Sequence, residues 1–151
     1  MAQPLMIKNT IVINAPAAEV WDALVNPRQT KKYMFGCEAI SNWKKGDPLL
    51  WKGIHEGKEV VFVKGFITDI QPEKLLVYTA YDPLNPAIED IPENYLTITY
   101  SLSSDRGKTT FVVTQGDYNK VADGKRRYEE SYNNGEGWHP LLVQIKNLVE
   151  G

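Results

Sequence analysis

The strongest constraint in this sequence is a change of hydrophobic period along the chain. Between residues 37 and 116, apolar and polar residues mostly alternate, which is the period of β-strands. After Tyr118 the period becomes about 3.6 residues, which is the period of an amphipathic helix. A strand-rich stretch followed by one apolar helical stripe favours a sheet that packs against a C-terminal helix.

The helical stripe continues almost to the end of the sequence. It contains apolar and aromatic residues at helical spacing: Tyr128, Tyr132, Trp138, Leu142, Ile145 and Val149. We therefore predict one long helix. Gly135, Gly137 and Pro140 are poor residues for a helix interior, at about 1–3 kcal/mol each, so we expect a kink within residues 135–140.

Seven strands and two short helices account for most of the rest. The predicted strands span residues 7–13, 38–43, 49–55, 59–70, 75–81, 95–102 and 109–115. Two helices, over residues 17–25 and 27–33, follow the first strand, with Pro16 and Pro27 at their starts. Short turns between consecutive strands indicate an antiparallel sheet, so the predicted class is α+β.

The strand over residues 59–70 has apolar residues on both faces. Val61, Val63 and Ile67 form one face, and Val60, Phe62 and Phe66 form the other. Two explanations remain open: a β-bulge at Gly65 that exchanges the faces, or a partner that covers the outer face.

Length and charge restrict the function classes. The chain has 151 residues, which fits a single domain over residues 1–151. With 42% hydrophobic and 24% charged residues, it is not a largely disordered sequence. The net charge of −2 argues against nucleic acid as the main partner.

The sequence offers few groups for targeting or metal binding. No apolar stretch approaches the ~18 residues of a membrane span, and the N-terminus lacks a signal-peptide pattern, so we expect a cytoplasmic protein. A single cysteine, Cys37, excludes an intrachain disulfide, and two histidines exclude a three-His metal site. We predict no metal and no cofactor. The acidic loop over residues 82–94 is interpreted as solvated, with a lid over a cavity as the alternative.

The aromatic residues suggest a polar-edged pocket. Four Trp and eight Tyr outnumber four Phe, and these residues combine an apolar body with a polar tip. A curved sheet on a helix leaves a cavity of several hundred Å³ in which such residues converge. The candidate pocket residues are Trp51, His55, Tyr78, Tyr100, Gln115, Tyr132, Trp138 and Leu142. A filled core is the alternative for the tryptophans, and an exposed strand end is the alternative for His55.

Several ordered segments resemble one family. They are the opening 11–21 that ends in Val20-Trp21, the Trp43–Pro48 turn, the 65–79 hairpin, the 107–115 turn and strand, and Gly137-Trp138 with the helix that follows. This order resembles the START-like (birch-pollen-allergen-like, SRPBCC) superfamily, in its activator-of-heat-shock-chaperone-ATPase homologue-1-like branch. The resemblance implies a helix-grip fold, in which the curved sheet wraps around the long C-terminal helix. Ala80 and Gln115 replace the Trp and His that the branch often has, which would alter the shape and polarity of a pocket.

Three functions follow from these observations. The first is a protein that binds a small hydrophobic or amphipathic ligand, without catalytic residues. The second is a cyclase- or hydrolase-like enzyme that uses His55 or Gln115 in the same cavity. The third is an interaction module, either a homodimer through Phe62 and Phe66 or, less favoured, a regulator of a chaperone ATPase.

Overall fold

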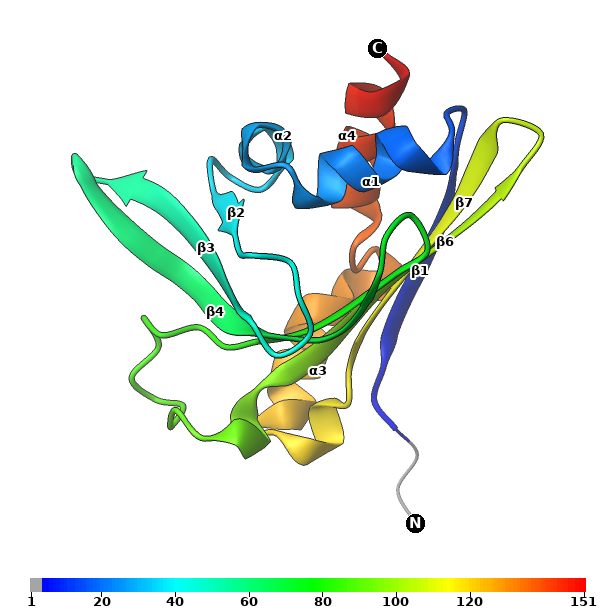
Figure 1. Cartoon of the computed structure of the whole chain (residues 1–151). Coiled ribbons are helices and arrows are strands. Elements are labelled where there is room, and N and C mark those ends of the chain that lie inside the picture. Colours follow the sequence, from blue (N-terminus) through cyan, green and yellow to red (C-terminus); the bar gives the residue numbers. More distant parts are fainter. Residues whose placement is uncertain (1–3) are drawn as a thin grey trace.

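The sheet is seven-stranded and entirely antiparallel (Figure 1). The structure, a computed structural model, describes residues 4–151. The strands are β1 (Ile7–Ile13), β2 (Glu38–Ile40), β3 (Pro48–His55), β4 (Lys58–Gln71), β5 (Leu75–Ala80), β6 (Leu96–Asp105) and β7 (Lys108–Gly116). Their order in the sheet is β1-β7-β6-β5-β4-β3-β2, so only β1 leaves the sequential arrangement. This confirms the α+β helix-grip fold.

Alternation along the strands decides which side chains enter the core. In β1, Ile7 and Ile13 are buried while Lys8 and Val12 are exposed. In β6 the inward residues are the ones that the alternation predicts: Leu96, Ile98, Tyr100 and Leu102. One face of the sheet therefore carries the core.

Two short helices lie over one end of the sheet (Figure 1). Helix α1 (Ala17–Val25) buries Val20, Ala23 and Leu24. Helix α2 (Pro27–Tyr33) begins with Pro27 at its first turn, and the Asn26 side chain accepts a hydrogen bond from the backbone N–H of Arg28. The Thr30 hydroxyl accepts a hydrogen bond from the Ala39 N–H, which fixes α2 against β2.

Strand β4 bends at two bulges, and neither is at Gly65. Trp51 pairs with Val63 and Lys52 pairs with Val61, so Phe62 has no partner in the ladder. A second irregularity leaves Thr68 unpaired opposite β5. The first bulge turns Phe62 toward the interior beside Val63, which decides a facing that the alternation leaves open and removes Phe62 from the surface that an interaction module would need.

Gly65 has a different role in β4. A Cβ at this position would lie 1.7 Å from the Thr79 carbonyl oxygen. The residue is therefore small because the backbones of β4 and β5 approach closely there.

The prediction of one long C-terminal helix is wrong. Helix α3 (Gly124–Tyr132) ends at a short turn, η3 (Asn133–Gly135), and α4 (His139–Glu150) then starts separately. Asn133, Asn134, Gly135 and Gly137 have positive φ values, and a right-handed helix cannot pass through left-handed residues. The expected kink at residues 135–140 is thus a complete break, and α4 makes the larger contact with β1 while α3 makes a smaller one.

The remaining short elements connect these parts. They are the 3₁₀ turns η1 (Pro92–Asn94) and η2 (Tyr118–Lys120), the latter just before α3. Within residues 4–151, no helix has both the length and the apolar character needed to cross a membrane.

Candidate functional pocket

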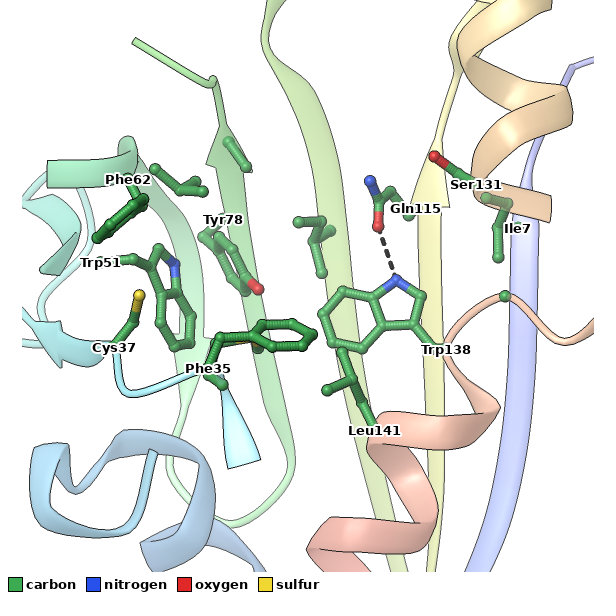
Figure 2. Close-up of a pocket in the computed structure, with 15 residues that line it drawn as sticks. Ile7, Phe35, Cys37, Trp51, Phe62, Tyr78, Gln115, Ser131, Trp138 and Leu141 are labelled. Carbon is green, nitrogen blue, oxygen red and sulfur yellow. Dashed lines mark hydrogen bonds between the residues drawn. The ribbon is translucent and has the colours of Figure 1, made fainter. Parts of the chain in front are cut away.

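A pocket of about 630 Å³ lies between the sheet and the C-terminal helices. Side chains from six strands, the loop after α2, α3 and the start of α4 meet there (Figure 2). The lining residues are Ile7, Met34, Phe35, Cys37, Trp51, Phe62, Val63, Tyr78, Ala80, Ile98, Gln115, Ser131, Gly137, Trp138 and Leu141. None of them is charged at neutral pH, and most are apolar.

One wall of the pocket is almost purely apolar. Trp51 of β3, Phe62 of β4 and Cys37 stand together on this side (Figure 2). Burial raises the pKa of the Cys37 thiol, so this group remains a neutral, weakly polar part of the wall. This side offers dispersion contacts and aromatic faces rather than hydrogen bonds.

The opposite wall carries an ordered polar chain. Trp138 Nε1 donates a hydrogen bond to Gln115 Oε1 at 2.6 Å, and Gln115 Nε2 donates to the Tyr118 hydroxyl at 2.9 Å. The Tyr118 hydroxyl also hydrogen-bonds the Ser131 side chain. Burial raises the pKa of Tyr118. The Gln115 amide is therefore held from both ends at the pocket surface.

Two tyrosines form a buried pair at the back of the pocket. The Tyr78 and Tyr100 hydroxyls are 2.7 Å apart, and both residues are almost fully buried. Burial raises the pKa of each phenol well above its usual value, so both remain protonated. Tyr78 lines the pocket, whereas Tyr100 lies behind it, edge-on to Phe111 and Trp138.

Phe35 lies across the pocket mouth and is exposed to solvent. Its ring points between Tyr78 and Trp138 in Figure 2, yet 86% of the residue remains accessible. Its φ is +53°, an uncommon conformation for a bulky residue. Two hydrogen bonds hold the turn that contains Phe35. The Cys37 N–H donates to the Met34 carbonyl, and the Thr30 hydroxyl donates to the Cys37 carbonyl. A strained backbone thus presents an aromatic ring to the pocket.

Asn9 of β1 holds the break between α3 and α4. Its side chain donates to the Glu136 carbonyl and accepts from the Trp138 N–H, at 3.1 and 2.9 Å. A Cβ at Gly137 would lie 2.5 Å from Asn9 Oδ1, so the close approach requires glycine. This clamp fixes the position of Trp138.

Four of the eight predicted pocket residues line the pocket: Trp51, Tyr78, Gln115 and Trp138. Two others are buried and do not line the pocket. Tyr100 hydrogen-bonds the lining residue Tyr78, and Leu142 follows the lining residue Leu141 in α4. The structure thus brings six of the eight residues to one region.

His55 and Tyr132 lie elsewhere, against the prediction. His55 is the last residue of β3, at the exposed tip of the β3–β4 hairpin, 3.8 Å from Glu56. Tyr132 is 44% exposed and stacks on Tyr128, because the helix ends at this residue and its ring no longer points into the sheet. The alternative interpretation of His55, an exposed strand end, is the correct one.

Among the lining residues that the sequence did not predict, Phe35 and Phe62 contribute two further aromatic rings. The sequence leaves the facing of Phe62 open, because strict alternation does not reveal a bulge. Phe35 precedes Gly36 in a short connection, and the aromatic residue beside a glycine was the available signal.

The acidic loop over residues 82–94 does not reach this pocket. Asp90 in the loop forms an ion pair with Lys64 and accepts a hydrogen bond from the Tyr95 hydroxyl, and both contacts lower its pKa. The loop is therefore bound to the outer side of the sheet. In the part of the chain that the structure describes, no three His, Cys, Asp or Glu side chains are grouped so as to hold a metal ion.

Residues 14–150 match the family described as activator of Hsp90 ATPase homolog 1-like protein. The chain belongs to this family. The match begins just after β1 and includes every element from α1 to α4, which agrees with the branch that the sequence resembles.

Similar solved structures share the fold over nearly the full chain. The solution structure of ChR145 from Cytophaga hutchinsonii is 34% identical, with a TM-score of 0.73, and the alignment covers 99% of this chain and 97% of that one. NE0264 from Nitrosomonas europaea is 18% identical, with a TM-score of 0.71 and coverage of 99% and 97%. The Aha1 dimer from Colwellia psychrerythraea is 17% identical, with a TM-score of 0.67 and coverage of 96% of each chain. No curated protein matches this chain.

Proposed function

We propose that this protein binds a small, mainly apolar molecule in the pocket between the sheet and the C-terminal helices. The observation that carries the proposal is the 630 Å³ pocket with its apolar and aromatic lining. Ligand pockets commonly have volumes of about 300–1,000 Å³ and a few placed polar groups. Gln115 and Tyr78 supply such groups here.

The composition of the lining favours binding over catalysis. Acid–base catalysis most often uses a His, a carboxylate or a lysine, and none of these lines this pocket. Burial raises the pKa of Cys37 and of Tyr78, the two titratable residues in the lining, so both stay protonated at neutral pH. Of the two residues considered for an enzyme, His55 lies at an exposed hairpin tip, and the Gln115 amide cannot shuttle protons.

An interaction role has less support from the surface. Of the two phenylalanines considered for a docking patch, only Phe66 remains exposed, since Phe62 lines the pocket. One half-exposed phenylalanine is small beside the few hundred Å² of typical interaction patches.

A pocket-filling variant tests the binding proposal. Ala80 lines the pocket, and Ala80→Phe should occupy much of the space. Val77 lies on the opposite face of the same strand, so Val77→Phe is the matched control. A neutral, environment-sensitive naphthalene dye, 6-propionyl-2-dimethylaminonaphthalene, serves as the probe.

We expect saturable binding of the dye to the wild-type protein and to Val77→Phe, with at least about tenfold weaker binding to Ala80→Phe, or ~1.4 kcal/mol. Equal affinities for Ala80→Phe and wild type would place the dye elsewhere and contradict the proposal. Absence of saturable binding to the wild-type protein, together with no co-purified small molecule in native mass spectrometry, would contradict it as well.

A further inference from the structure

The hydrogen-bonding state of Gln115 restricts which molecules suit the pocket. We propose that the ligand is uncharged and carries a carbonyl-type acceptor oxygen, which the Gln115 side-chain amide recognises by donating a hydrogen bond. This inference rests on the proposed function, because it names the class of ligand for the same pocket.

The orientation of the Gln115 amide follows from its partners. The Trp138 indole N–H can only donate, so the atom that faces it at 2.6 Å must be the amide oxygen. The amide nitrogen then faces the Tyr118 hydroxyl at 2.9 Å. A glutamine flip would place two donors against each other at Trp138, so this arrangement is chemically determined.

One hydrogen of the Gln115 amide remains for a ligand. The NH₂ group has two hydrogens, and the Tyr118 hydroxyl takes one of them. Within residues 4–151, the amide nitrogen donates no other hydrogen bond, and Gln115 belongs to the pocket wall. The polar wall therefore offers a donor to the pocket at a fixed position (Figure 2).

A second donor lies deeper in the pocket. The Tyr78 and Tyr100 hydroxyls share one hydrogen bond at 2.7 Å, so only one of their two hydrogens is used between them. Tyr78 lines the pocket, and its hydroxyl points toward the centre in Figure 2. When Tyr100 donates within the pair, the Tyr78 hydrogen is available to a second acceptor on the ligand.

The lack of charge in the lining argues against an ionic ligand. A buried carboxylate or ammonium loses its hydration and requires an opposite charge or several hydrogen bonds in return. No lysine, arginine, aspartate or glutamate lines the pocket. Arg127 interacts electrostatically with Tyr118, but it does not line the pocket, and its guanidinium donates a hydrogen bond to the Ala122 carbonyl.

Three probes test the inference, and they differ only in one substituent of three non-hydrogen atoms. They are 2-acetylnaphthalene, 2-isopropylnaphthalene and 2-naphthoate, which present a carbonyl, a hydrocarbon and a carboxylate on the same ring. Their affinities for wild type, Gln115→Met and Gln115→Glu are measured by calorimetry at neutral pH. Gln115→Glu retains an acceptor for Trp138 but, when ionised, has no hydrogen to donate.

We expect both variants to bind the ketone about five- to tenfold more weakly than wild type, while the affinity for the hydrocarbon changes less than about twofold. We also expect the wild-type protein to bind naphthoate at least about tenfold more weakly than the ketone. The infrared C=O band of the bound ketone should lie at lower frequency in wild type than in Gln115→Met. A variant that merely disturbs the pocket would weaken ketone and hydrocarbon alike.

The outcomes separate this inference from the proposed function. If ketone and hydrocarbon bind but respond equally to both Gln115 variants, the recognition by Gln115 is wrong and the binding function stands. If naphthoate binds as tightly as the ketone, the restriction to uncharged ligands is wrong. If none of the three probes binds, the proposed function itself fails.

Discussion

Both halves of the sheet are antiparallel, but they differ in how the helices cover them. The closed half, which we define as β1, β7 and β6, lies under α4, and Phe111, Val113, Leu142 and Ile145 are at most 1% exposed there. The open half, defined as β3 and β4, extends away from the helices (Figure 1) and has Ile54 71% exposed at its tip. The pocket lies where the closed half gives way to the open half. Alternating apolar and polar residues are therefore enough to form strands, but a face of the sheet becomes core only where helices cover it.

The largest expected effect separates the two halves by one substitution. Phe111→Ala in the closed half should lower the free energy of unfolding by about 3–5 kcal/mol, because a fully buried ring leaves a cavity. Phe62→Ala in the open half should lower it by only ~1 kcal/mol, since this ring already borders the pocket. Urea denaturation measures both values. Equal losses would mean that the pocket is as closely packed as the core.

An intermediate effect is expected where the two halves meet, at the tyrosine pair. Tyr78→Phe leaves the Tyr100 hydroxyl buried behind the pocket without its partner, which should cost about 1–3 kcal/mol of unfolding free energy. In Tyr100→Phe the Tyr78 hydroxyl loses its partner, but Tyr78 lines the pocket, so we expect a water in the pocket to replace the hydrogen bond and about 1 kcal/mol or less to be lost. Urea unfolding of both variants tests this order, and a larger loss for Tyr100→Phe would show that the Tyr78 hydroxyl has no access to water.

The smallest expected effect on stability concerns Phe35. Because its φ of +53° disfavours any side chain, Phe35→Gly should leave the free energy of unfolding unchanged or raise it by up to ~1 kcal/mol. The same change at Ile54, an exposed strand residue, should lower it by about 1 kcal/mol. Phe35→Gly should also lower the affinity for the naphthalene dye severalfold, because the Phe35 ring lies across the pocket mouth.

Urea unfolding and dye titration of the two glycine variants check this contrast. A clear loss of stability in Phe35→Gly would assign the ring to the core. Unchanged dye affinity would remove Phe35 from the binding surface.

The sequence predicted those parts of the fold that depend on side-chain period. The alternation in β1 and β6 predicts their buried residues correctly because each of these strands has one wet and one dry face. In β4 the alternation fails at Phe62, since a bulge changes the phase by one residue without any mark in the hydrophobic pattern.

The helix break shows the same limit. The apolar stripe continues through residues 133–138 at helical spacing, although four residues there have left-handed backbones. Asn and Gly, as in Asn133-Asn134-Gly135, favour left-handed backbone conformations. The prediction of one helix follows the spacing of the apolar residues instead of this local signal. Tyr132 was therefore placed in the pocket, whereas Trp138, on the far side of the break, does line it.

The Asn9 clamp also has a consequence for the order in which the pocket forms during synthesis. Asn9 and Trp138 are separated by 129 residues, and α4 contributes a second link of this kind through Lys146 and the Val12 carbonyl. At about 5–20 residues per second, a ribosome needs roughly 6–26 seconds to supply the second partner of the clamp. Throughout that interval the first strand of the sheet exists without the contacts that place Trp138 in the pocket wall. The binding site thus forms only after Trp138 has been synthesised, 129 residues after its partner Asn9 in the first strand.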